Sequence, residues 1–311
     1  MIIGSYQGAT KIGGMLRALA AQTLPQSRFE IVVVLNGSRH HTIKVINEIR
    51  EDHPDLIIRH LSYSALGLGR ARNAGMAMAR GRYVTFVDDD DTVSPGYLEG
   101  LLTCSAPDTV GLAHLADVHG AGVAPNFDTR MSRQLELAGR TLHISEIPVA
   151  LTYSVGKMLP TALAREIGFD PELRNGEDIA FYIRFFMRHP LKIRICPLDA
   201  NATYYRAVVP GSMSRQAPSY DFNVTQRLDI LERLEELHPT EEWHAVALRQ
   251  LRRSVTAFIR RYLRSHPDQW PAIVADIERR RLTTVPLDML MQVVQEHEAA
   301  QQQSTPLFLA G

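Results

Sequence analysis

The sequence begins with a regular alternation of short apolar segments and segments of helical periodicity, and this alternation most constrains the fold. The clearest apolar run, Phe29–Leu35, is continuous and rich in β-branched residues, which is typical of a parallel strand buried on both faces. Further strands are predicted at Ile2–Ile3, Leu56–Leu61 and Tyr83–Val87, and helices at Gly13–Ala21, Thr42–Arg50 and Gly69–Arg80. This order predicts an α/β domain whose mostly parallel sheet is flanked by helices and binds ligands at the carboxyl ends of its strands.

The rest of the chain separates into a mixed region and a purely helical one. In the mixed region we expect strands at Thr109–Ala116, Lys192–Cys196 and Ala202–Ala207 and a helix at Ile179–Met187. From about Tyr220 the apolar residues recur only at helical spacing, as in Leu228, Leu231, Leu234 and Leu237. We therefore predict two domains, residues 1–218 and a helical appendage of residues 219–311, whose end frays from about Gln301.

Composition argues against several classes of protein. The formal net charge of zero gives no general basic excess, so no nucleic-acid partner is expected. Cys104 and Cys196 lie far apart in the sequence and fit small buried residues in a reducing compartment better than a disulfide framework. No apolar stretch approaches the ~18 residues of a membrane span, and the N-terminus lacks a signal-peptide pattern. These features predict a cytoplasmic protein.

Four consecutive aspartates, Asp88–Asp91, follow the predicted strand Tyr83–Val87 directly. Adjacent carboxylates repel one another, so the cluster is costly unless a cation neutralises it. Mg²⁺ and Mn²⁺ are hard cations that prefer oxygen ligands and commonly bridge to substrate phosphates. The alternative is a solvated acidic loop or a helix start, since Thr92-Val93-Ser94-Pro95 follows and acidic residues suit a helix N-terminus.

Several short motifs follow one another in a distinctive order. They are Gly4-Ser5-Tyr6-Gln7, Asn36-Gly37-Ser38, Ala71-Arg72-Asn73, the aspartates after Phe86-Val87, and Gly176-Glu177-Asp178. This ordered set closely resembles the family 2 glycosyltransferases over roughly Met1–Ser214. The resemblance implies a GT-A fold for the catalytic domain, residues 1–218, a nucleotide-sugar donor, a divalent metal ion (Mn²⁺ or Mg²⁺) and transfer with inversion.

The resemblance also assigns roles to the acidic residues. The family's Asp-x-Asp element maps onto Asp88, Asp89 and Asp90, with Asp91 as a further metal candidate. It is expected to hold the metal ion against the donor diphosphate, and Asp88 and Asp89 are also candidates for contact with the nucleotide sugar. Because the run offers several registers, the resemblance does not decide which aspartates bind the ion.

Glu177-Asp178 maps onto the family's Glu-Asp pair, in which the aspartate is the expected general base. An inverting displacement needs a carboxylate on the acceptor side to take the hydroxyl proton, and a neighbouring acid can raise the pKa of that base. We therefore assign Asp178 as base and Glu177 as the residue that orients it. Without the resemblance, a Glu-Asp pair at a helix start is ordinary N-terminal charge placement.

The remaining candidates for nucleotide-sugar binding are Ser5, Tyr6, Asn36, Arg70, Arg72, Asn73 and Arg206. Asn36 stands where the family usually has an acidic residue that reads the base. An amide can still donate and accept hydrogen bonds, so a UDP-sugar stays the favoured donor. Arg72 could bind the diphosphate or hold the aspartates in place by bidentate pairing. Arg206 could meet phosphate, beside Ser212-Met213-Ser214, which resembles a loop that closes over the donor.

The helical appendage carries no motif that we can assign. Its arginines could dock at an anionic membrane surface, which would suit a lipid-linked acceptor, or they could form a solvated face. These arginines are Arg249, Arg252, Arg253, Arg260, Arg261 and Arg264. A homodimer formed through the same helices is an equal alternative.

The leading hypothesis is an inverting glycosyltransferase that acts on a hydroxyl acceptor in glycan, polysaccharide or glycolipid synthesis. A metal-dependent nucleotidyltransferase is an alternative, but such enzymes usually carry a Gly-rich phosphate loop near the first strand, and Gly13-Gly14 is only a slight match. A glycosyltransferase-like binding or scaffold protein without turnover is a second alternative, which the departure at Asn36 favours.

Overall fold

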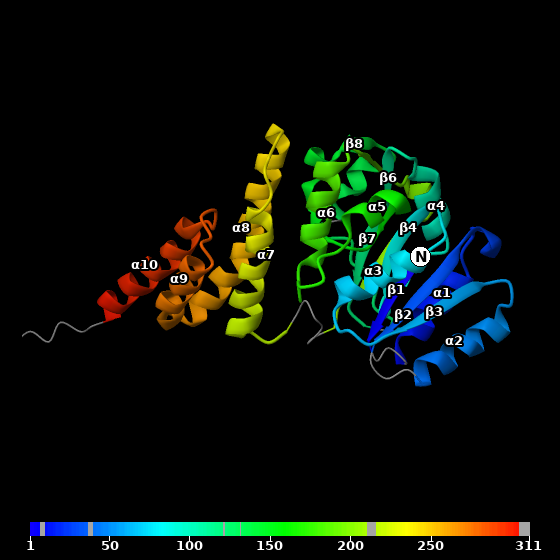
Figure 1. Ribbon diagram of the computed structural model, residues 1–311, viewed down its shortest axis with the longest axis horizontal. Coiled ribbons are helices and arrows are strands. Elements are labelled where there is room, and N and C mark those ends of the chain that lie inside the picture. The colour runs from blue at the N-terminus through cyan, green and yellow to red at the C-terminus, as the bar shows by residue number, and fades with distance from the viewer. Residues whose placement is uncertain (7–9, 37–39, 121, 131, 210–215, 305–311) are drawn as a thin grey trace, which may run out of the picture. The chain divides into compact units, whose positions relative to one another are not determined.

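A computed structural model describes residues 1–6, 10–36, 40–120, 122–130, 132–209 and 216–304 (Figure 1). The chain divides into two compact units, Met1–Pro210 and Gly211–Gly311. The catalytic boundary at residue 218 stays a prediction. The residues Gln7, Gly37, Ser38 and Ser212–Ser214, which belong to motifs noted above, lie outside the described residues.

The first unit is built on an eight-stranded sheet in the order β3-β2-β1-β4-β9-β6-β10-β8. Its first four strands are parallel and alternate with helices, which confirms the predicted α/β architecture. The elements are β1 (Ile2–Tyr6), α1 (Ile12–Ala20), β2 (Glu30–Asn36), α2 (His40–Asp52), β3 (Ile57–Tyr63), α3 (Leu68–Met78) and β4 (Tyr83–Asp88).

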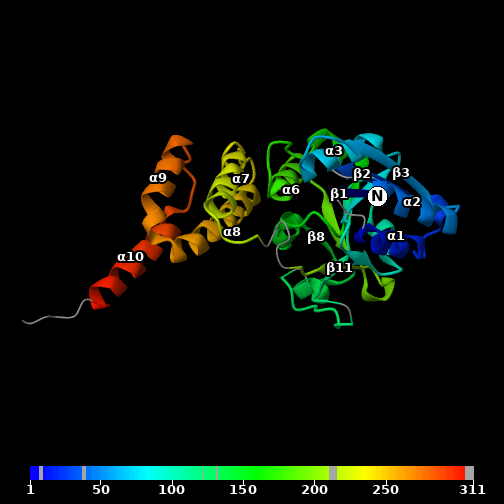
Figure 2. The same ribbon diagram turned by 90° about the horizontal axis from the view of Figure 1, so that it is seen from below.

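The two directions of winding place the helices on both faces of this sheet. Right-handed connections from β1 to β2 and on to β3 put α1 and α2 together on one face, whereas the return from β3 to β4 puts α3 on the other (Figure 2). β2 is covered from both sides, and its residues from Ile31 to Leu35 are buried. The chain reverses its direction of winding between β1 and β4, so their neighbouring carboxyl ends form the crevice where such sheets bind ligands.

The predicted single strand Thr109–Ala116 is wrong, because the chain breaks at Ala113 and changes sheets. β6 (Thr109–Leu112) lies in the large sheet, and β7 (His114–Val118) lies in a three-stranded sheet in the order β5-β11-β7. At the break, the amide of Ala113 donates to the carbonyl of Gly156 at 2.8 Å. An apolar run shows burial but not which neighbour supplies the hydrogen bonds.

The remaining elements of this unit include several that the sequence did not predict. The predicted helix and strands appear as α6 (Glu177–Arg188), β10 (Lys192–Ile195) and β11 (Thr203–Ala207). Those missed are β5 (Thr92–Val93), α4 (Tyr97–Cys104), β8 (Thr141–His143), β9 (Lys157–Pro160) and α5 (Thr161–Ile167). Strand β9 is antiparallel to both β4 and β6, and it joins the parallel half of the sheet to the rest.

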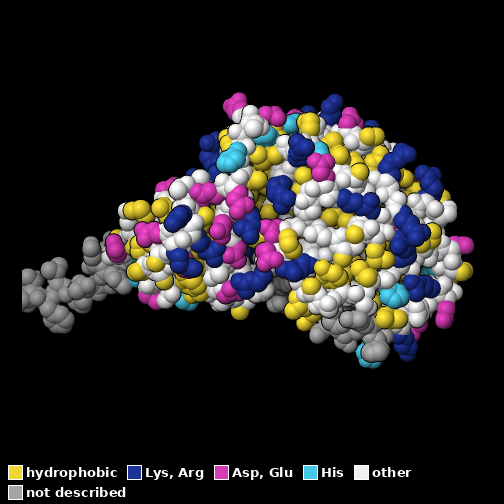
Figure 3. Space-filling view, viewed as in Figure 1, with side chains coloured by type: hydrophobic (Ala, Val, Ile, Leu, Met, Phe, Trp, Pro, Cys, Tyr) yellow, Lys and Arg dark blue, Asp and Glu magenta, His cyan; other side chains and the backbone are white. Residues whose placement is uncertain are grey.

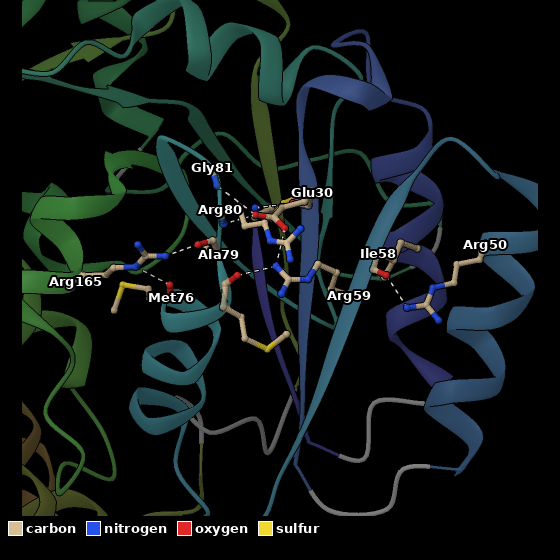
Figure 4. Close-up of polar contacts among 11 residues, drawn as sticks. Glu30, Arg50, Ile58, Arg59, Met76, Ala79, Arg80, Gly81 and Arg165 are labelled. Carbon is tan, nitrogen blue, oxygen red and sulfur yellow. Dashed lines mark hydrogen bonds and ion pairs between the residues drawn. The ribbon is translucent and has the colours of Figure 1, made fainter.

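At the amino end of the sheet, a set of polar contacts fixes the end of α3 (Figure 4). Glu30 accepts hydrogen bonds from the Arg80 amide and, at 3.1 Å, from Arg59. Arg59 also donates to the Met78 carbonyl at 2.7 Å. Arg165 donates to the Met76 carbonyl at 2.8 Å, so side chains from two other elements satisfy carbonyls that the helix end leaves open. α3 carries Arg72, and these contacts hold its C-terminal end in place.

The second unit is helical, as predicted. After a π-helical turn at Asp221–Thr225 it contains α7 (Gln226–Glu235), α8 (Glu242–Ser265), α9 (Trp270–Arg279) and α10 (Leu287–Ser304). α10 continues to Ser304, so the fraying expected from Gln301 is not seen before that residue. In the part of the chain that the structure describes, no helix is both long and apolar enough to cross a membrane.

The surface of this second unit mixes charges of both signs. On the face seen in Figure 3, Lys and Arg side chains are interspersed with Asp and Glu. Arg280 pairs with Asp229 at 2.8 Å and with Glu232 at 3.0 Å. Arg252 donates to the Leu234 carbonyl at 2.8 Å and is half-buried, whereas Arg249 is exposed. Membrane docking through these arginines stays a prediction.

Candidate active site

One buried arginine joins the two acidic motifs that the sequence singles out. Arg72 lies on α3 and is 3% exposed. Its Nη1 donates to Glu177 Oε1 at 2.7 Å, and its Nη2 donates to Asp88 Oδ1 at 3.2 Å. Nη2 also donates to the hydroxyl of Ser154 at 2.9 Å. The end of β4 and the start of α6, distant in sequence, are therefore connected through a single guanidinium group.

Aromatic rings enclose this guanidinium group. Its central carbon lies 5.3 Å from the ring centroid of Phe169 and 6.0 Å from that of Phe86. Burial lowers the pKa of Arg72, but the carboxylates of Glu177 and Asp88 more than compensate, so its pKa lies above the ordinary value. The group therefore stays charged, and it acts as a fixed positive centre between the two motifs.

The first three aspartates of the run point to different partners at the carboxyl end of β4. Asp88 is partly exposed beside Arg72, and Asp90 lies 3.4 Å from the ammonium group of Lys11. Asp89 Oδ2 accepts a hydrogen bond from the Ser5 hydroxyl at 2.6 Å. Burial raises the pKa of Asp89 to about 6, with Asp90 and Asp88 adding to the rise and the Ser5 hydrogen bond opposing it.

The fourth aspartate is bonded within the protein interior. Asp91 is buried, and its Oδ2 accepts a hydrogen bond from the Tyr204 hydroxyl at 2.5 Å. Its Oδ1 accepts another from the Ala207 amide at 2.7 Å. Burial, followed by the neighbouring Asp88, raises the pKa of Asp91 well above its usual range. In this arrangement Asp91 holds β11 against the end of β4, and both of its oxygens already have partners.

The oxygen donors at this strand end suit a hard divalent cation. The described residues contain no group of three or more His, Cys, Asp or Glu side chains arranged to hold a metal ion by themselves. Mg²⁺ commonly uses only one or two carboxylates and completes its shell with water and substrate phosphates. The partly exposed carboxylates of Asp88 and Asp90 fit that role, with Asp89 beside them.

Asp178 lies in the first turn of α6, next to the buried Glu177. Its Oδ1 accepts a hydrogen bond from the Ile179 amide at 2.8 Å. Burial raises the pKa of Asp178 to about 7, Glu177 adds to the rise, and Arg72 and Lys157 oppose it. A carboxylate with a pKa near neutrality can take a proton more readily than an ordinary aspartate.

Tyr6 and Asn36 end two neighbouring parallel strands and are paired in register. The Tyr6 ring is 62% exposed, whereas Asn36 is only 6% exposed. Asn36 Oδ1 is buried without a hydrogen-bond partner among the described residues. A buried carbonyl oxygen that lacks a donor is costly, and a ligand group could satisfy it.

The other candidates for nucleotide-sugar binding are engaged with the protein. Arg70 donates to the Pro171 carbonyl at 2.8 Å and pairs with Glu172 at 2.6 Å. The Asn73 side chain donates to the Phe169 carbonyl and accepts from its amide, each at 2.8 Å. These bonds hold the loop before α6 against α3, and a role for either side chain in donor binding stays a prediction.

Arg206 is likewise bonded to a residue of its own sheet. Its Nε and Nη2 donate to the two carboxylate oxygens of Asp117 at 2.8 and 2.9 Å. Its guanidinium carbon also lies 5.4 Å from the ring centroid of Tyr153. Its role toward phosphate stays a prediction, because the bidentate pair has to open before the fork can meet a donor.

Sequence reasoning assigned no role to two residues near this site. Lys157 is completely buried on β9, and its ammonium group lies 4.2 Å from the ring centroid of Tyr182. Ser154 bonds to Arg72 through its side chain and accepts from the Tyr182 hydroxyl at 2.9 Å through its carbonyl. A lysine inside an apolar strand is the only sequence signal for the first, and nothing in the sequence marks the second.

Comparison with known proteins bears on this geometry. Residues 1–110 match the family model described as Glycosyl transferase family 2. Over these residues the chain is similar to the family 2 glycosyltransferases. The chain is 27% identical over 248 residues to the poly(ribitol-phosphate) beta-N-acetylglucosaminyltransferase TarS of Staphylococcus aureus, covering 76% of this chain and 41% of that protein. It is also 23% identical over 212 residues to the poly(ribitol-phosphate) beta-glucosyltransferase of Bacillus spizizenii, covering 67% of this chain and 32% of that protein. This chain thus spans less than half of the length of either relative.

Solved structures agree on the fold. The chain resembles the crystal structure of S. aureus TarS 1-349 in complex with UDP-GlcNAc, with a TM-score of 0.66 and 21% identity, covering 98% of this chain and 92% of that one. A mannosyltransferase from Pyrobaculum calidifontis, in complex with GDP-Man and Mn²⁺, matches with a TM-score of 0.57 and 15% identity, covering 96% and 86%. These likenesses confirm the GT-A fold.

Proposed function

We propose that this protein is an inverting glycosyltransferase that moves a sugar from a nucleoside diphosphate sugar to a hydroxyl acceptor. The observation that carries the proposal is the pair of ion pairs made by Arg72. These ion pairs bring the partly exposed Asp88, at the end of β4, and the buried Glu177, at the start of α6, to the same guanidinium group. An inverting transfer needs this division, with one acidic group facing the leaving diphosphate and another facing the acceptor.

On the donor side, Asp88 and Asp90 are the residues that we assign to a Mn²⁺ or Mg²⁺ ion, with Asp89 as a further ligand or a contact to the nucleotide sugar. When bound, the ion supplies stabilisation of the negative charge that develops on the departing diphosphate. Ser5 fixes the Asp89 carboxylate by its hydrogen bond of 2.6 Å. Asp91 serves this site by holding β11 in place, because both of its oxygens are bonded within the protein.

On the acceptor side, the Asp178 carboxylate takes the proton of the acceptor hydroxyl. The acceptor oxygen then forms a bond to the anomeric carbon as the bond from that carbon to the diphosphate oxygen breaks. Glu177 acts through Arg72, because its carboxylate is buried in the ion pair at 2.7 Å. It holds the start of α6, and so Asp178, in position.

We favour a uridine nucleotide because of Asn36 and Tyr6. Uracil presents an N–H donor flanked by carbonyl acceptors, and an Asn side chain offers the complementary acceptor and donor. The buried Asn36 Oδ1 lacks a partner in the described structure, and the exposed Tyr6 ring lies at the end of the adjacent strand, where a base could stack. The UDP-GlcNAc complex of TarS adds support by analogy.

The acceptor is a hydroxyl group of a glycan, a polysaccharide or a lipid-linked chain. Two relatives are named as poly(ribitol-phosphate) transferases, which supports a polyhydroxylated polymer as the acceptor. We further propose a cytoplasmic location, with peripheral membrane contact or homodimer formation through the C-terminal helices as open roles for the second unit.

The test is a thermal-shift screen of UDP-, GDP- and dTDP-sugars with and without Mn²⁺, followed by product analysis. A ligand that binds only the folded state raises the melting temperature, and we expect the largest Mn²⁺-dependent rise with a UDP-sugar. Turnover should release UDP, and Asp178→Asn should abolish release while retaining the thermal shift. Pyrophosphate as product would favour the nucleotidyltransferase, and binding without any release would favour the silent protein.

A further inference from the structure

Lys157 is a completely buried lysine for which the proposed reaction gives no role. It opens β9 and is 0% exposed. Its ammonium group donates to the Tyr153 carbonyl and, at 3.5 Å, to that of Val155. The same group lies over the face of the Tyr182 ring, 4.2 Å from its centroid. A charge removed from water is costly unless opposite charge and hydrogen bonds offset it, so the site is built around the ammonium ion.

The Tyr182 ring connects this lysine to the proposed base. Tyr182 follows Asp178 by one turn of α6, so the two side chains share one face of the helix. Helical side chains lean toward the N-terminus, which directs the Tyr182 ring toward the turn that carries Asp178. Its hydroxyl is anchored to the Ser154 carbonyl at 2.9 Å. The ammonium group over that ring therefore lies beside this part of α6, and the charges of Lys157 and Asp178 each favour the ionised form of the other.

Charge balance at the site leaves a place for this second cation. Three carboxylates, those of Glu177, Asp88 and Asp178, raise the pKa of Arg72. Arg72 makes ion pairs with Asp88 at 3.2 Å and with Glu177 at 2.7 Å. Asp178 makes no ion pair with any of the residues that the structure describes, so its charge is the one left without a direct partner. Lys157 is the second cation whose charge acts on Asp178.

We propose that Lys157 is a positioning residue whose buried ammonium group keeps Asp178 ionised, and so able to accept the proton of the acceptor hydroxyl. The inference rests on the proposed function and adds a residue to it. A nearby positive charge favours the ionised form of a carboxylic acid, whereas burial and Glu177 favour the protonated form. Burial lowers the pKa of Lys157 itself to about 7, with the Asp178 charge opposing and the Arg72 charge adding to the fall.

The first test measures UDP release from UDP-N-acetylglucosamine with Mn²⁺, with water in place of the acceptor, as a function of pH. In Lys157→Met, the acidic limb of the rate profile should move to higher pH by about one unit, which lowers the rate about tenfold on that limb. Lys157→Arg keeps the charge and should return the limb toward its original position. Lys192→Met removes an exposed lysine from β10 and serves as the matched control. Identical limbs in the wild type and Lys157→Met would overturn the inference.

The second test needs no turnover. Urea unfolding is measured for the wild type, Lys157→Met, Asp178→Asn and the double variant between about pH 5 and about pH 8. Asp178→Asn should raise the urea midpoint more in the Lys157→Met background than in the wild type. The difference should grow with pH as Asp178 ionises and fall again above about pH 7, where Lys157 loses its proton. Equal effects in both backgrounds contradict the pairing. Intact coupling without any UDP release would instead overturn the proposed function and leave the pairing supported.

Discussion

The hydroxyl group of Tyr204 donates a hydrogen bond of 2.5 Å to the carboxylate of Asp91. The Tyr204 hydroxyl oxygen also accepts a hydrogen bond of 3.0 Å from the Asp88 amide. One buried side chain on β11 therefore sets the backbone at the start of the aspartate run and the side chain at its end. The Tyr204 hydroxyl thus holds the Asp91 side chain in the interior, whereas the three aspartates before it are partly exposed.

Tyr204→Phe should destabilise the protein, because it leaves the buried Asp91 Oδ2 and the Asp88 amide without partners. An unsatisfied buried group costs about 1–3 kcal/mol, so we expect a loss of that order in the free energy of unfolding, measured by urea denaturation. Tyr205→Phe is the matched control, since the neighbouring ring is only half-buried. Equal free energies of unfolding for the two variants would show that the hydrogen bonds of the Tyr204 hydroxyl do not stabilise the protein.

Asn substitutions at Asp90 and Asp91 should have separable effects. Asp90 is partly exposed, and Lys11 is its only ion-pair partner among the described residues. Asp90→Asn should therefore weaken Mn²⁺-dependent donor binding by about tenfold or more with little change in stability. Asp91→Asn should instead lower stability, because an amide nitrogen replaces an oxygen that now accepts a hydrogen bond. Calorimetric titration with Mn²⁺ and UDP, alongside urea unfolding, distinguishes them. A large loss of Mn²⁺ affinity in Asp91→Asn at unchanged stability would assign that residue to the metal.

The parallel half of the fold was predictable because its signals are local. Its clearest strand, β2, is a continuous apolar run because its residues from Ile31 to Leu35 are buried. The later strands depend on non-local choices. β9 contains Lys157 and ends in Pro160, which are poor strand signals, and it forms because β4 and β6 lie on either side of it. The break at Ala113 depends in the same way on distant partners.

The candidate site shows the same division between local and non-local information. Motif order was enough to single out Asp88 and Asp178, because residue type and spacing are visible in a sequence. The partner of each side chain was not visible. Whether Arg72 faced phosphate or carboxylates was open, and the structure shows bonds to Asp88 and Glu177. That Asp91 turns inward depends on Tyr204, which arrives from a strand late in the sequence.

Arg72→Lys should be strongly disruptive despite keeping the charge. A lysine has one nitrogen and cannot reach Glu177, Asp88 and Ser154 together, as the fork of Arg72 does. Breaking a buried ion pair typically costs about 3–5 kcal/mol, and we expect a destabilisation toward the lower end because the charge remains. Urea unfolding measures it, with the exposed Arg82→Lys as control. A change within about 0.5 kcal/mol would contradict the central role given to this residue.

Mn²⁺ binding should weaken as the pH falls through about 6, because Asp89 must lose its proton to bind a cation or stay near one. In the metal-free protein the sign for stability is opposite. The folded-state pKa of Asp89 is raised from 3.8 to about 6, so its contribution is fully present at low pH and is lost as the pH rises through about 6. Ser5→Ala removes the hydrogen bond that opposes the rise in the pKa of Asp89, so the Mn²⁺ binding midpoint should move to higher pH.

Titrations of Mn²⁺ affinity against pH measure this shift in Ser5→Ala. The control is Ser62→Ala, at an exposed position on β3, which should leave the midpoint in place. A midpoint that does not respond to Ser5→Ala would remove Asp89 from the groups that govern the cation.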